Sequence, residues 1–363
     1  MTSPAAGPAE RPNFAEHVVA WQRVHGRRDL PWQNTRDPYR VWLSEIMLQQ
    51  TRVQVVLGYY ARFLARFPSV AALAAADVGD VLAAWSGLGY YSRARNLHRC
   101  AQVVVAEHGG AFPTTSAALA MLPGIGRSTA AAIAAFCFGE RAAILDGNVK
   151  RVLARVLAFD GDLAEQRAER ALWQAATALL PAVGIEPYTQ GLMDLGATVC
   201  LARSPHCLIC PVAADCAAAA TATQDRYPVK TRRLVRKRRE SVWLELRWKG
   251  DVWLVERDAR GVWAGLWSLP ELDSMTAFDA VAAGWPGDGA VAAPFVHVLT
   301  HLDWHLQPVR WTFPPRTPAR TMAALLATWP SGRWFAPDAA LALGLPAPLK
   351  RRLADGALSD RRP

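Results

Sequence analysis

The spacing of hydrophobic residues divides the chain into two parts of different structural type. In the first part, apolar residues recur every three or four positions, as at Leu43, Ile46 and Met47, and an alanine-rich stretch follows at 130–135. This period places apolar side chains on one face of a helix, and alanine has the highest intrinsic helix propensity. We therefore predict a mainly α-helical domain over residues 14–225.

The later part of the chain alternates apolar and polar residues, which is the period of a half-buried β-strand. It also holds ten of the 15 tryptophans. Four strands are predicted, at 241–248, 252–257, 296–299 and 306–313. The first two are joined by Lys249-Gly250-Asp251, which is typical of a hairpin. Residues 241–355 are therefore expected to form an α+β domain.

A basic segment separates the two predicted domains. Residues 226–240 hold eight basic residues and one acidic residue, and the whole chain has a formal net charge of +10. This charge favours a polyanionic partner such as nucleic acid, and a solvated linker is an equal alternative for the segment alone. Short tails are predicted at 1–13 and 356–363. The chain has no apolar run long enough to span a membrane and no secretory signal, so a cytoplasmic protein is expected.

Four of the six cysteines are clustered within 17 residues. Their spacing is C-x6-C-x2-C-x5-C, at Cys200, Cys207, Cys210 and Cys216. In a cytoplasmic chain, clustered cysteines indicate a metal site rather than disulfides. Four thiolates suit tetrahedral zinc and a [4Fe–4S] cluster alike, and the spacing alone does not choose between them.

A glycine-containing motif lies between two predicted helices in the region of about 114–138. It reads Leu-Pro-Gly-Ile-Gly-Arg-Ser-Thr over residues 122–129. Gly124 and Gly126 permit positive φ and a tight turn. The turn would leave backbone N–H groups at the start of the second helix free to bind phosphate. A plain turn between packed helices is the alternative.

Two carboxylates stand in contexts that favour acid–base chemistry. Glu45 interrupts an apolar helix, where removal from water should raise its pKa and keep it protonated near neutral pH. A capped or paired structural glutamate is the alternative. Asp146 precedes a helical run, and the pattern alone favours an N-cap. A catalytic pair requires both side chains to face one pocket.

These motifs together resemble those of the helix-hairpin-helix DNA glycosylases, and most closely the MutY-type adenine DNA glycosylases. The resemblance covers about residues 29–218, including S-E-I-M-L-Q-Q-T at 44–51 and D-G-N-V at 146–149. It implies a [4Fe–4S] cluster on the four cysteines in a loop at 200–216. It also implies that Glu45 protonates adenine and handles the water, that Asp146 stabilises the cationic sugar, and that Asn148 lies beside them.

The same resemblance assigns residues to DNA and to the extruded base. The DNA contacts it implies are Gln50, Thr51, Leu88, Tyr90, Gly124, Gly126 and Arg127. Tyr90 lies in G-L-G-Y-Y at 87–91, a loop similar to the one that wedges into the base stack. Trp32 and Gln190 match positions that line the adenine pocket. The implied partner is double-stranded DNA, bound by a monomer that flips the adenine out of the duplex.

Position 128 separates this family from its nearest rival. Endonuclease III relatives have a catalytic lysine there, which forms a Schiff base and nicks the strand, whereas this chain has Ser128. The expected enzyme is therefore monofunctional and acts through water. An endonuclease III-type glycosylase for oxidised pyrimidines and a non-catalytic protein that binds DNA lesions are the alternatives.

The C-terminal domain resembles the Nudix (MutT-like) domain of the same family. The similarity rests on G-V-W-A-G-L-W at 261–267, and no glutamate-rich hydrolase box follows it. This domain is expected to bind without hydrolysing nucleotides. Leu299, Thr300 and His301 match the Phe-Ser-His loop that reads 8-oxoguanine in the family. The resemblance thus implies excision of adenine paired with 8-oxoguanine or guanine, in base excision repair.

Overall fold

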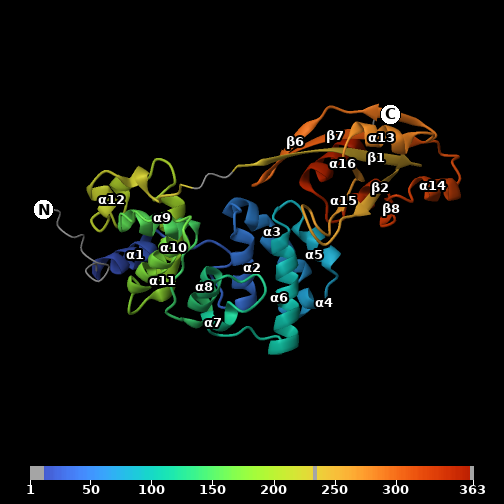
Figure 1. The fold of residues 1–363 in the computed structure, drawn as a ribbon. Helices are drawn as coiled ribbons and strands as arrows, with labels where there is room; N and C mark the ends of the chain where they lie inside the picture. The colour runs from blue at the N-terminus through green and yellow to red at the C-terminus, as the bar shows by residue number, and fades with distance from the viewer. Residues whose placement is uncertain (1–11, 232–234, 360–363) are drawn as a thin grey trace. The chain divides into compact units, whose positions relative to one another are not determined.

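A computed structural model describes residues 12–231 and 235–359, which belong to two compact units (Figure 1). The helical unit comprises residues 1–74 and 99–233, and the mixed unit comprises 75–98 and 234–363. Residues 75–98, which the sequence placed in the helical domain, therefore group with the C-terminal domain. Over the described parts of the chain, no helix is long and apolar enough to cross a membrane.

Short helices build the helical unit. They are α1 (Pro12–His25), α2 (Pro38–Leu48), α3 (Val53–Arg66), α4 (Val70–Ala75), α7 (Ser116–Leu119), α8 (Arg127–Phe138), α9 (Gly147–Val156), α10 (Gln166–Ala178), α11 (Ile185–Thr198) and α12 (Ala217–Ala220), with 3-10 turns at Cys207–Ile209 and Gln224–Arg226; α6 (Ser92–His108) is shared with the mixed unit. Asp37 caps α2 by accepting from the Tyr39 N–H, and Pro38 fits the first turn because it needs no hydrogen bond there. The predicted helical character of this part is confirmed.

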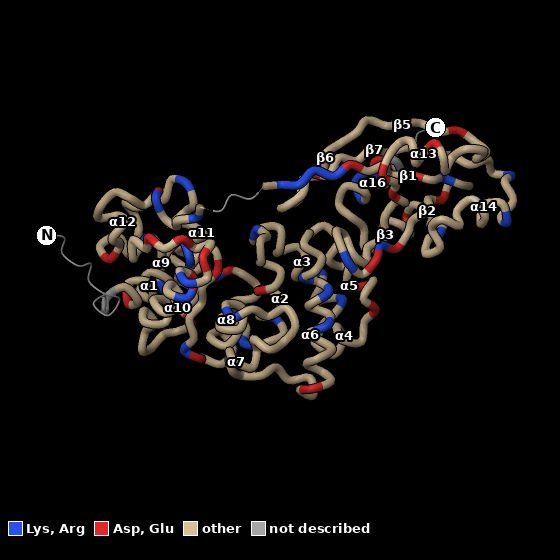
Figure 2. The backbone as a smooth tube through the Cα atoms, in the orientation of Figure 1, with Lys and Arg blue, Asp and Glu red and all other residues tan. Residues whose placement is uncertain are grey.

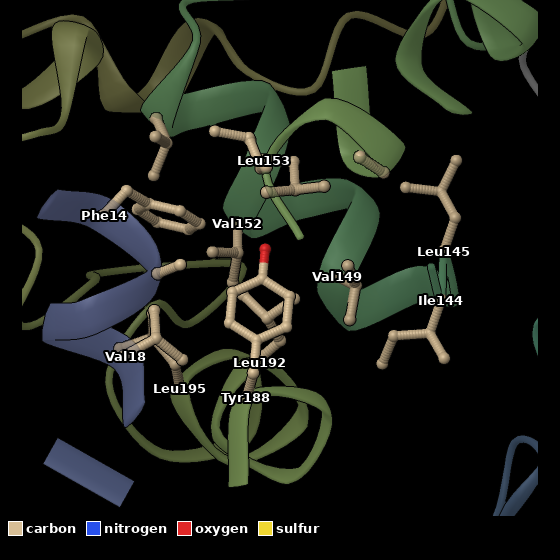
Figure 3. Packing of buried hydrophobic residues seen from close by; sticks show 14 of the residues in the cluster. Phe14, Val18, Ile144, Leu145, Val149, Val152, Leu153, Tyr188, Leu192 and Leu195 are labelled. Carbon is tan, nitrogen blue, oxygen red and sulfur yellow. The ribbon is translucent and has the colours of Figure 1, made fainter. Parts of the chain in front are cut away.

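The core of the helical unit lies between α1, α9 and α11 (Figure 3). Phe14 of α1 meets Tyr188 of α11 edge to face, with ring centroids 6.3 Å apart. Val152 of α9 and Leu195 of α11 are fully buried in the same cluster. Burial of an aliphatic side chain of this size contributes about 1.5–3 kcal/mol. This packing fixes α9, and with it the residue at its N-terminus, Asp146.

A mixed sheet forms most of the mixed unit. Its strands are β1 (Lys237–Trp248), β2 (Asp251–Glu256), β3 (Trp267–Ser268), β4 (Glu271–Leu272), β5 (Asp288–Val291), β6 (Phe295–Val298), β7 (Leu302–Phe313) and β8 (Gly332–Phe335). Its helices are α5 (Val78–Trp85), α13 (Met275–Ala282), α14 (Ala319–Leu325), α15 (Pro337–Leu341) and α16 (Ala347–Ser359). The strand order β3-β2-β1-β7-β5 includes one parallel pair, β1 with β7, which runs from Lys237↔Leu302 to Trp248↔Phe313.

The α+β prediction for this part is confirmed, with differences at the strand ends. Trp248 pairs with Asp251, so the turn holds two residues, Lys249 and Gly250, with φ of 53° and 90°. Two successive left-handed residues suit the twist of a hairpin. β7 begins at Leu302, four residues before the predicted start. β1 begins at Lys237, inside the segment 226–240 that we predicted as a linker.

Basic residues follow one another at the start of β1 (Figure 2). Residues 237–240 of this strand are exposed. Arg238 pairs with Glu240 at 2.5 Å, and Arg239 pairs with Glu271 at 2.5 Å. The β1 end of the basic segment is thus partly neutralised within the mixed unit. Residues 232–234 of the segment lie outside the described residues.

Residues 75–98 are held to the C-terminal part of the mixed unit by buried hydrogen bonds. The hydroxyl groups of Ser86 and Tyr91 both donate to the Leu345 carbonyl, at 3.2 and 2.9 Å. Arg95 Nη1 donates to the Ala264 carbonyl at 2.8 Å. Because backbone carbonyls buried away from water need partners, these bonds tie the helix–loop segment to the loops around the sheet.

Candidate active site

One cavity in the helical unit has a volume of about 880 Å³. Eight of the residues predicted for the site line it: Trp32, Glu45, Gln50, Thr51, Ser128, Asp146, Asn148 and Gln190. A second cavity of about 210 Å³ shares Arg27, Trp32, Glu45 and Gln190 with it. The structure therefore brings both candidate acids to one pocket, although they stand about 100 residues apart in the sequence.

Glu45 lies on α2 with apolar neighbours on its own helix, and its remaining accessible surface faces the two cavities. Burial is the larger cause that raises the pKa of this carboxyl, and the negative charge of Asp146 adds to it, giving a value of about 8. A carboxylic acid with such a pKa is protonated at neutral pH and is ready to donate a proton. The predicted direction of the shift therefore agrees with the structure.

Asp146 is the N-cap of α9, as the sequence pattern favoured. Its Oδ1 accepts from the Val149 N–H at 2.8 Å. Burial raises the pKa of Asp146, while backbone N–H groups of Val149 and Asn148 and the charges of Arg151 and Lys150 oppose that rise. These donors and cations favour the ionised form, whereas burial and the charge of Asp146 both raise the pKa of Glu45. The two environments thus give the two carboxyls different proton affinities.

Ser128 connects the hairpin to the segment that carries Asp146. Its Oγ accepts from the Leu145 N–H at 3.0 Å. Ser128 lines the cavity at the position where, by resemblance, endonuclease III relatives have a lysine. Its hydrogen bond to Leu145 holds the backbone immediately before Asp146. The side chain has no amine with which to form a Schiff base.

Arg151 was not among the predicted site residues, although it lines the cavity. Its Nη2 donates to Asn148 Oδ1 at 3.0 Å and to the Gly196 carbonyl at 2.6 Å, and its Nε donates to the Cys200 carbonyl at 2.7 Å. The arginine thereby links the cavity wall to the start of the cysteine segment. Its position three residues after Asn148 on one helix face is the sequence signal that could have revealed it.

A second network at the cavity was also missed by the sequence analysis. Asp194 of α11 is 1% exposed and accepts from Arg27 Nε at 2.7 Å, from the Arg27 N–H at 2.9 Å and from Gln190 Nε2 at 2.9 Å. Arg27 and Asp194 also form an ion pair at 2.7 Å. Because these two residues are 167 positions apart, no local pattern reports their pairing.

The hairpin has one left-handed glycine rather than two. Gly124 has a φ of 76°, whereas Gly126 is the N-cap of α8 with a φ of −81°, in the extended region that any residue adopts. Only Gly124 uses the positive φ that both glycines permit. Within the described chain no side chain caps α8, which leaves first-turn N–H groups for a ligand or water. The Arg127 guanidinium lies 4.0 Å from the centroid of the Trp173 ring.

The predicted wedge loop belongs to the mixed unit and is internally braced. Gly89 and Tyr90 have φ of 73° and 48°, and the Gly89 carbonyl accepts from Trp85 Nε1 at 3.2 Å and from Arg93 Nη2 at 3.3 Å. Tyr90 is 45% exposed. Leu88, predicted as a DNA contact beside it, is only 6% exposed, because it packs inward from the loop. The exposed tip is the tyrosine.

The two regions predicted to read the lesion meet within the mixed unit. The Tyr90 hydroxyl lies 3.2 Å from Thr300 Oγ1, and Thr300 and His301 are both exposed. Thr300 and His301 occupy the turn between β6 and β7. The hydroxyl group that the resemblance requires at position 300 is therefore at the surface, next to the exposed aromatic tip.

All four clustered cysteines line one further cavity in the helical unit, with largely apolar walls from α9, α11 and the loop that follows. Burial raises the pKa of Cys210 to about 11, and the other three thiols add to this rise. Arg155 Nη1 donates to Cys200 Sγ at 3.4 Å. Among the described residues, no three side chains of ligating type come close enough to hold a single metal ion. Four thiols around one apolar cavity fit a larger group with four thiolate ligands.

Comparison with known proteins identifies the family. Residues 43–177 match the HhH-GPD superfamily of base excision DNA repair proteins, and residues 242–355 match the NUDIX domain. An adenine DNA glycosylase of Buchnera aphidicola from Acyrthosiphon pisum is 34% identical over 303 residues, which are 82% of this chain and 85% of that protein. The chain belongs to the adenine DNA glycosylase family.

Other known proteins are similar to the chain over its helical part. The human adenine DNA glycosylase is 40% identical over 227 residues, covering 60% of this chain and 41% of that protein. A thermostable thymine-DNA glycosylase structure matches with a TM-score of 0.52 and 29% identity, over 58% of this chain and 97% of that one. An endonuclease III–DNA complex matches with a TM-score of 0.50 at 19% identity, over 60% of this chain and 99% of that one, and shows the shared fold. The predicted family, fold and enzyme class are confirmed: the protein is an N-glycosylase that excises adenine in base excision repair.

Proposed function

We propose that the glycosylase is monofunctional and removes adenine opposite 8-oxoguanine or guanine in duplex DNA, with Glu45 as the acid and Asp146 as the stabilising anion. The observation that carries the proposal is that these two carboxyls line one cavity, where burial raises the pKa of both but only Asp146 has backbone N–H groups and cations that oppose the rise. The family assignment indicates that adenine is the base removed, and the cavity holds the two carboxyls that the reaction needs.

An acid is needed because the adenine anion is a poor leaving group. Glu45, protonated near neutral pH, gives its proton to a ring nitrogen as the glycosidic bond stretches, and the base leaves as neutral adenine. The deoxyribose then carries positive charge, as in glycoside hydrolysis, and the Asp146 carboxylate stabilises it. Glu45, now ionised, accepts a proton from the water that attacks the sugar, which returns the acid to its starting state.

Strand nicking is not part of this proposal, because Ser128 offers no amine. The hydroxyl instead accepts from the Leu145 N–H and so holds the backbone before Asp146. Water is the nucleophile, and the product is an abasic site in an intact strand.

The mixed unit supports the choice of the opposite base. Tyr90 and Thr300 present adjacent hydroxyl groups at an exposed aromatic tip, and His301 lies next to them. An aromatic ring fills the gap left in the stack when a base is flipped. The hydroxyl groups can hydrogen-bond to the base left behind, and we assign them to 8-oxoguanine or guanine.

The remaining assignments follow from the same proposal. We assign double-stranded DNA as the partner and a monomer as the active form. We also propose that the enzyme acts on chromosomal DNA in the cytoplasm. Cys200, Cys207, Cys210 and Cys216 would hold a [4Fe–4S] cluster, which when bound would order the loop 200–216 against α9. The proton transfers described above involve none of these cysteines.

Single-turnover cleavage of defined duplexes tests the proposal. Duplexes with adenine opposite 8-oxoguanine, guanine or thymine are incubated with excess enzyme, and half of each sample is treated with alkali. We expect breaks only after alkali, with 8-oxoguanine and guanine favoured over thymine. Breaks without alkali, or equal rates for all three opposite bases, would contradict the monofunctional assignment or the opposite-base assignment respectively.

A further inference from the structure

We propose that Asp194 fixes the orientation of the Gln190 side-chain amide so that the amide oxygen, Oε1, faces the cavity. A hydrogen-bond acceptor at this place makes the pocket prefer a purine with an amino group at position 6. Asp194 is a positioning residue that acts through Gln190 and makes no contact with the base itself. The inference rests on the proposed function, since it takes this cavity to be the one that receives the flipped base.

The first step is the placement of Gln190. Its side chain lines both cavities, as do those of Glu45 and Trp32, so all three meet at the junction of the two spaces. A base that accepts a proton from Glu45 must enter this junction. Gln190 is therefore among the few groups with hydrogen-bonding atoms that can read the edge of that base.

The second step is the charge state of Asp194. The side chain is 1% exposed and forms an ion pair with the Arg27 guanidinium at 2.7 Å. Its other oxygen accepts from the Arg27 backbone N–H at 2.9 Å. A carboxylate in this pairing is an acceptor at both oxygens and has no proton to offer.

The third step is the orientation that this acceptor forces on the amide. Gln190 Nε2 lies 2.9 Å from Asp194 Oδ1. The reversed amide would place two acceptor oxygens at that separation, deep in the protein, where the repulsion is strong. Only the orientation with Nε2 toward Asp194 is favourable, and it leaves Gln190 Oε1 as the amide atom for the cavity.

The fourth step is recognition. Adenine carries an amino donor at position 6, whereas hypoxanthine and guanine carry a carbonyl acceptor there. An oxygen fixed in the cavity accepts from the amino group and repels the carbonyl. Unsubstituted purine has only hydrogen at that position and neither gains nor loses this bond.

Four variants distinguish a role of Asp194 in orienting Gln190 from a purely structural role. Asp194→Ala removes the acceptor and frees the Gln190 amide to rotate. Asp194→Asn keeps an oxygen at the Oδ1 place, because the Arg27 guanidinium requires an acceptor there, and it gives up the bond from the Arg27 backbone N–H at the Oδ2 place. Gln190→Met removes the amide at similar volume. Thr198→Ala is the matched control, since Thr198 Oγ1 donates to the Asp194 backbone carbonyl and not to its carboxylate.

The experiment measures single-turnover excision of adenine, purine and hypoxanthine, each opposite 8-oxoguanine, by the full-length enzyme. We expect Asp194→Ala and Gln190→Met to lower the adenine-to-purine rate ratio by about 10- to 100-fold, the loss of one buried hydrogen bond. The adenine-to-hypoxanthine ratio should fall further in Asp194→Ala. Asp194→Asn and Thr198→Ala should keep the wild-type ratios.

The double variant Asp194→Ala, Gln190→Met decides whether Asp194 acts through Gln190. Its adenine-to-purine ratio should equal that of Gln190→Met alone. A further drop in the ratio, or an Asp194→Ala variant that slows all three bases by one factor, overturns the inference. If Asp194→Ala does not fold, an unchanged ratio in Gln190→Met overturns it equally. The proposed function has a separate test. If the wild-type enzyme releases adenine opposite thymine as fast as opposite 8-oxoguanine, the proposed choice of opposite base is wrong, but the ratios between adenine, purine and hypoxanthine still test the role of Asp194.

Discussion

The Glu45→Gln variant should become more stable than the wild type as the pH rises, although it lacks the acid of the reaction. The carboxyl has a pKa of about 8 in the folded chain, against a value of 4.5 without the protein around it. Below pH 4.5 the group is protonated in both states and has no effect. Between these values the unfolded chain releases the proton and the folded chain keeps it, so the free energy of unfolding falls as the pH rises.

The size of the effect follows from the two pKa values. Each pH unit between them is worth about 1.4 kcal/mol, so the loss reaches about 5 kcal/mol above pH 8. The glutamine side chain has no proton to lose over this range. The variant should therefore gain about 4 kcal/mol over the wild type at pH 8.5, relative to the difference at pH 5, because part of the loss has already occurred at pH 5.

Urea unfolding followed by circular dichroism at both pH values measures this double difference. Glu186→Gln is the matched control, because Glu186 lines the 210 Å³ cavity and its side chain is 47% exposed. It should show the same small difference from wild type at both pH values. If Glu45→Gln behaves in the same way, the carboxyl is ionised at no cost and cannot be the proton donor that we describe.

Three further outcomes test other parts of the site. Single-turnover adenine release should decline above pH about 8, as Glu45 loses its proton, and a rate that stays level to pH 9.5 would exclude this acid. Asp146→Asn should lower the rate by about 10²–10³-fold and leave product binding intact, as judged by gel shift with abasic-site duplex. Ser128→Lys should yield a complex with nicked DNA that borohydride traps, and the absence of a trapped complex would show that position 128 does not reach the sugar.

The sequence predicted most of what depends on local pattern. The helical period found α2, and Asp146 was correctly seen as an N-cap because capping involves only the next three residues. The pocket shared by Glu45 and Asp146 came from resemblance and not from pattern. The pairing of Arg27 with Asp194 was missed because it joins distant segments, and pairing of that kind is decided by packing.

Two details of local conformation could not be predicted from composition. Glycine permits positive φ at both Gly124 and Gly126, but the residue before a helix normally has an extended backbone, and Gly126 does too. Leu88 was expected at the surface with Tyr90, yet successive residues of a tight loop point in different directions, and Leu88 is the one turned inward. Composition marks such a loop without indicating which side chain is exposed.

The core beneath the active site sets an order of events during synthesis on the ribosome. Phe14 of α1 packs against Tyr188 of α11, so the helix made first must await a partner encoded 174 positions later. At about 5–20 residues per second, that wait lasts about 9–35 seconds. Until then the part of α1 that packs against α11 has no native cover. A ribosome that pauses in this interval holds a chain whose catalytic pocket cannot yet exist.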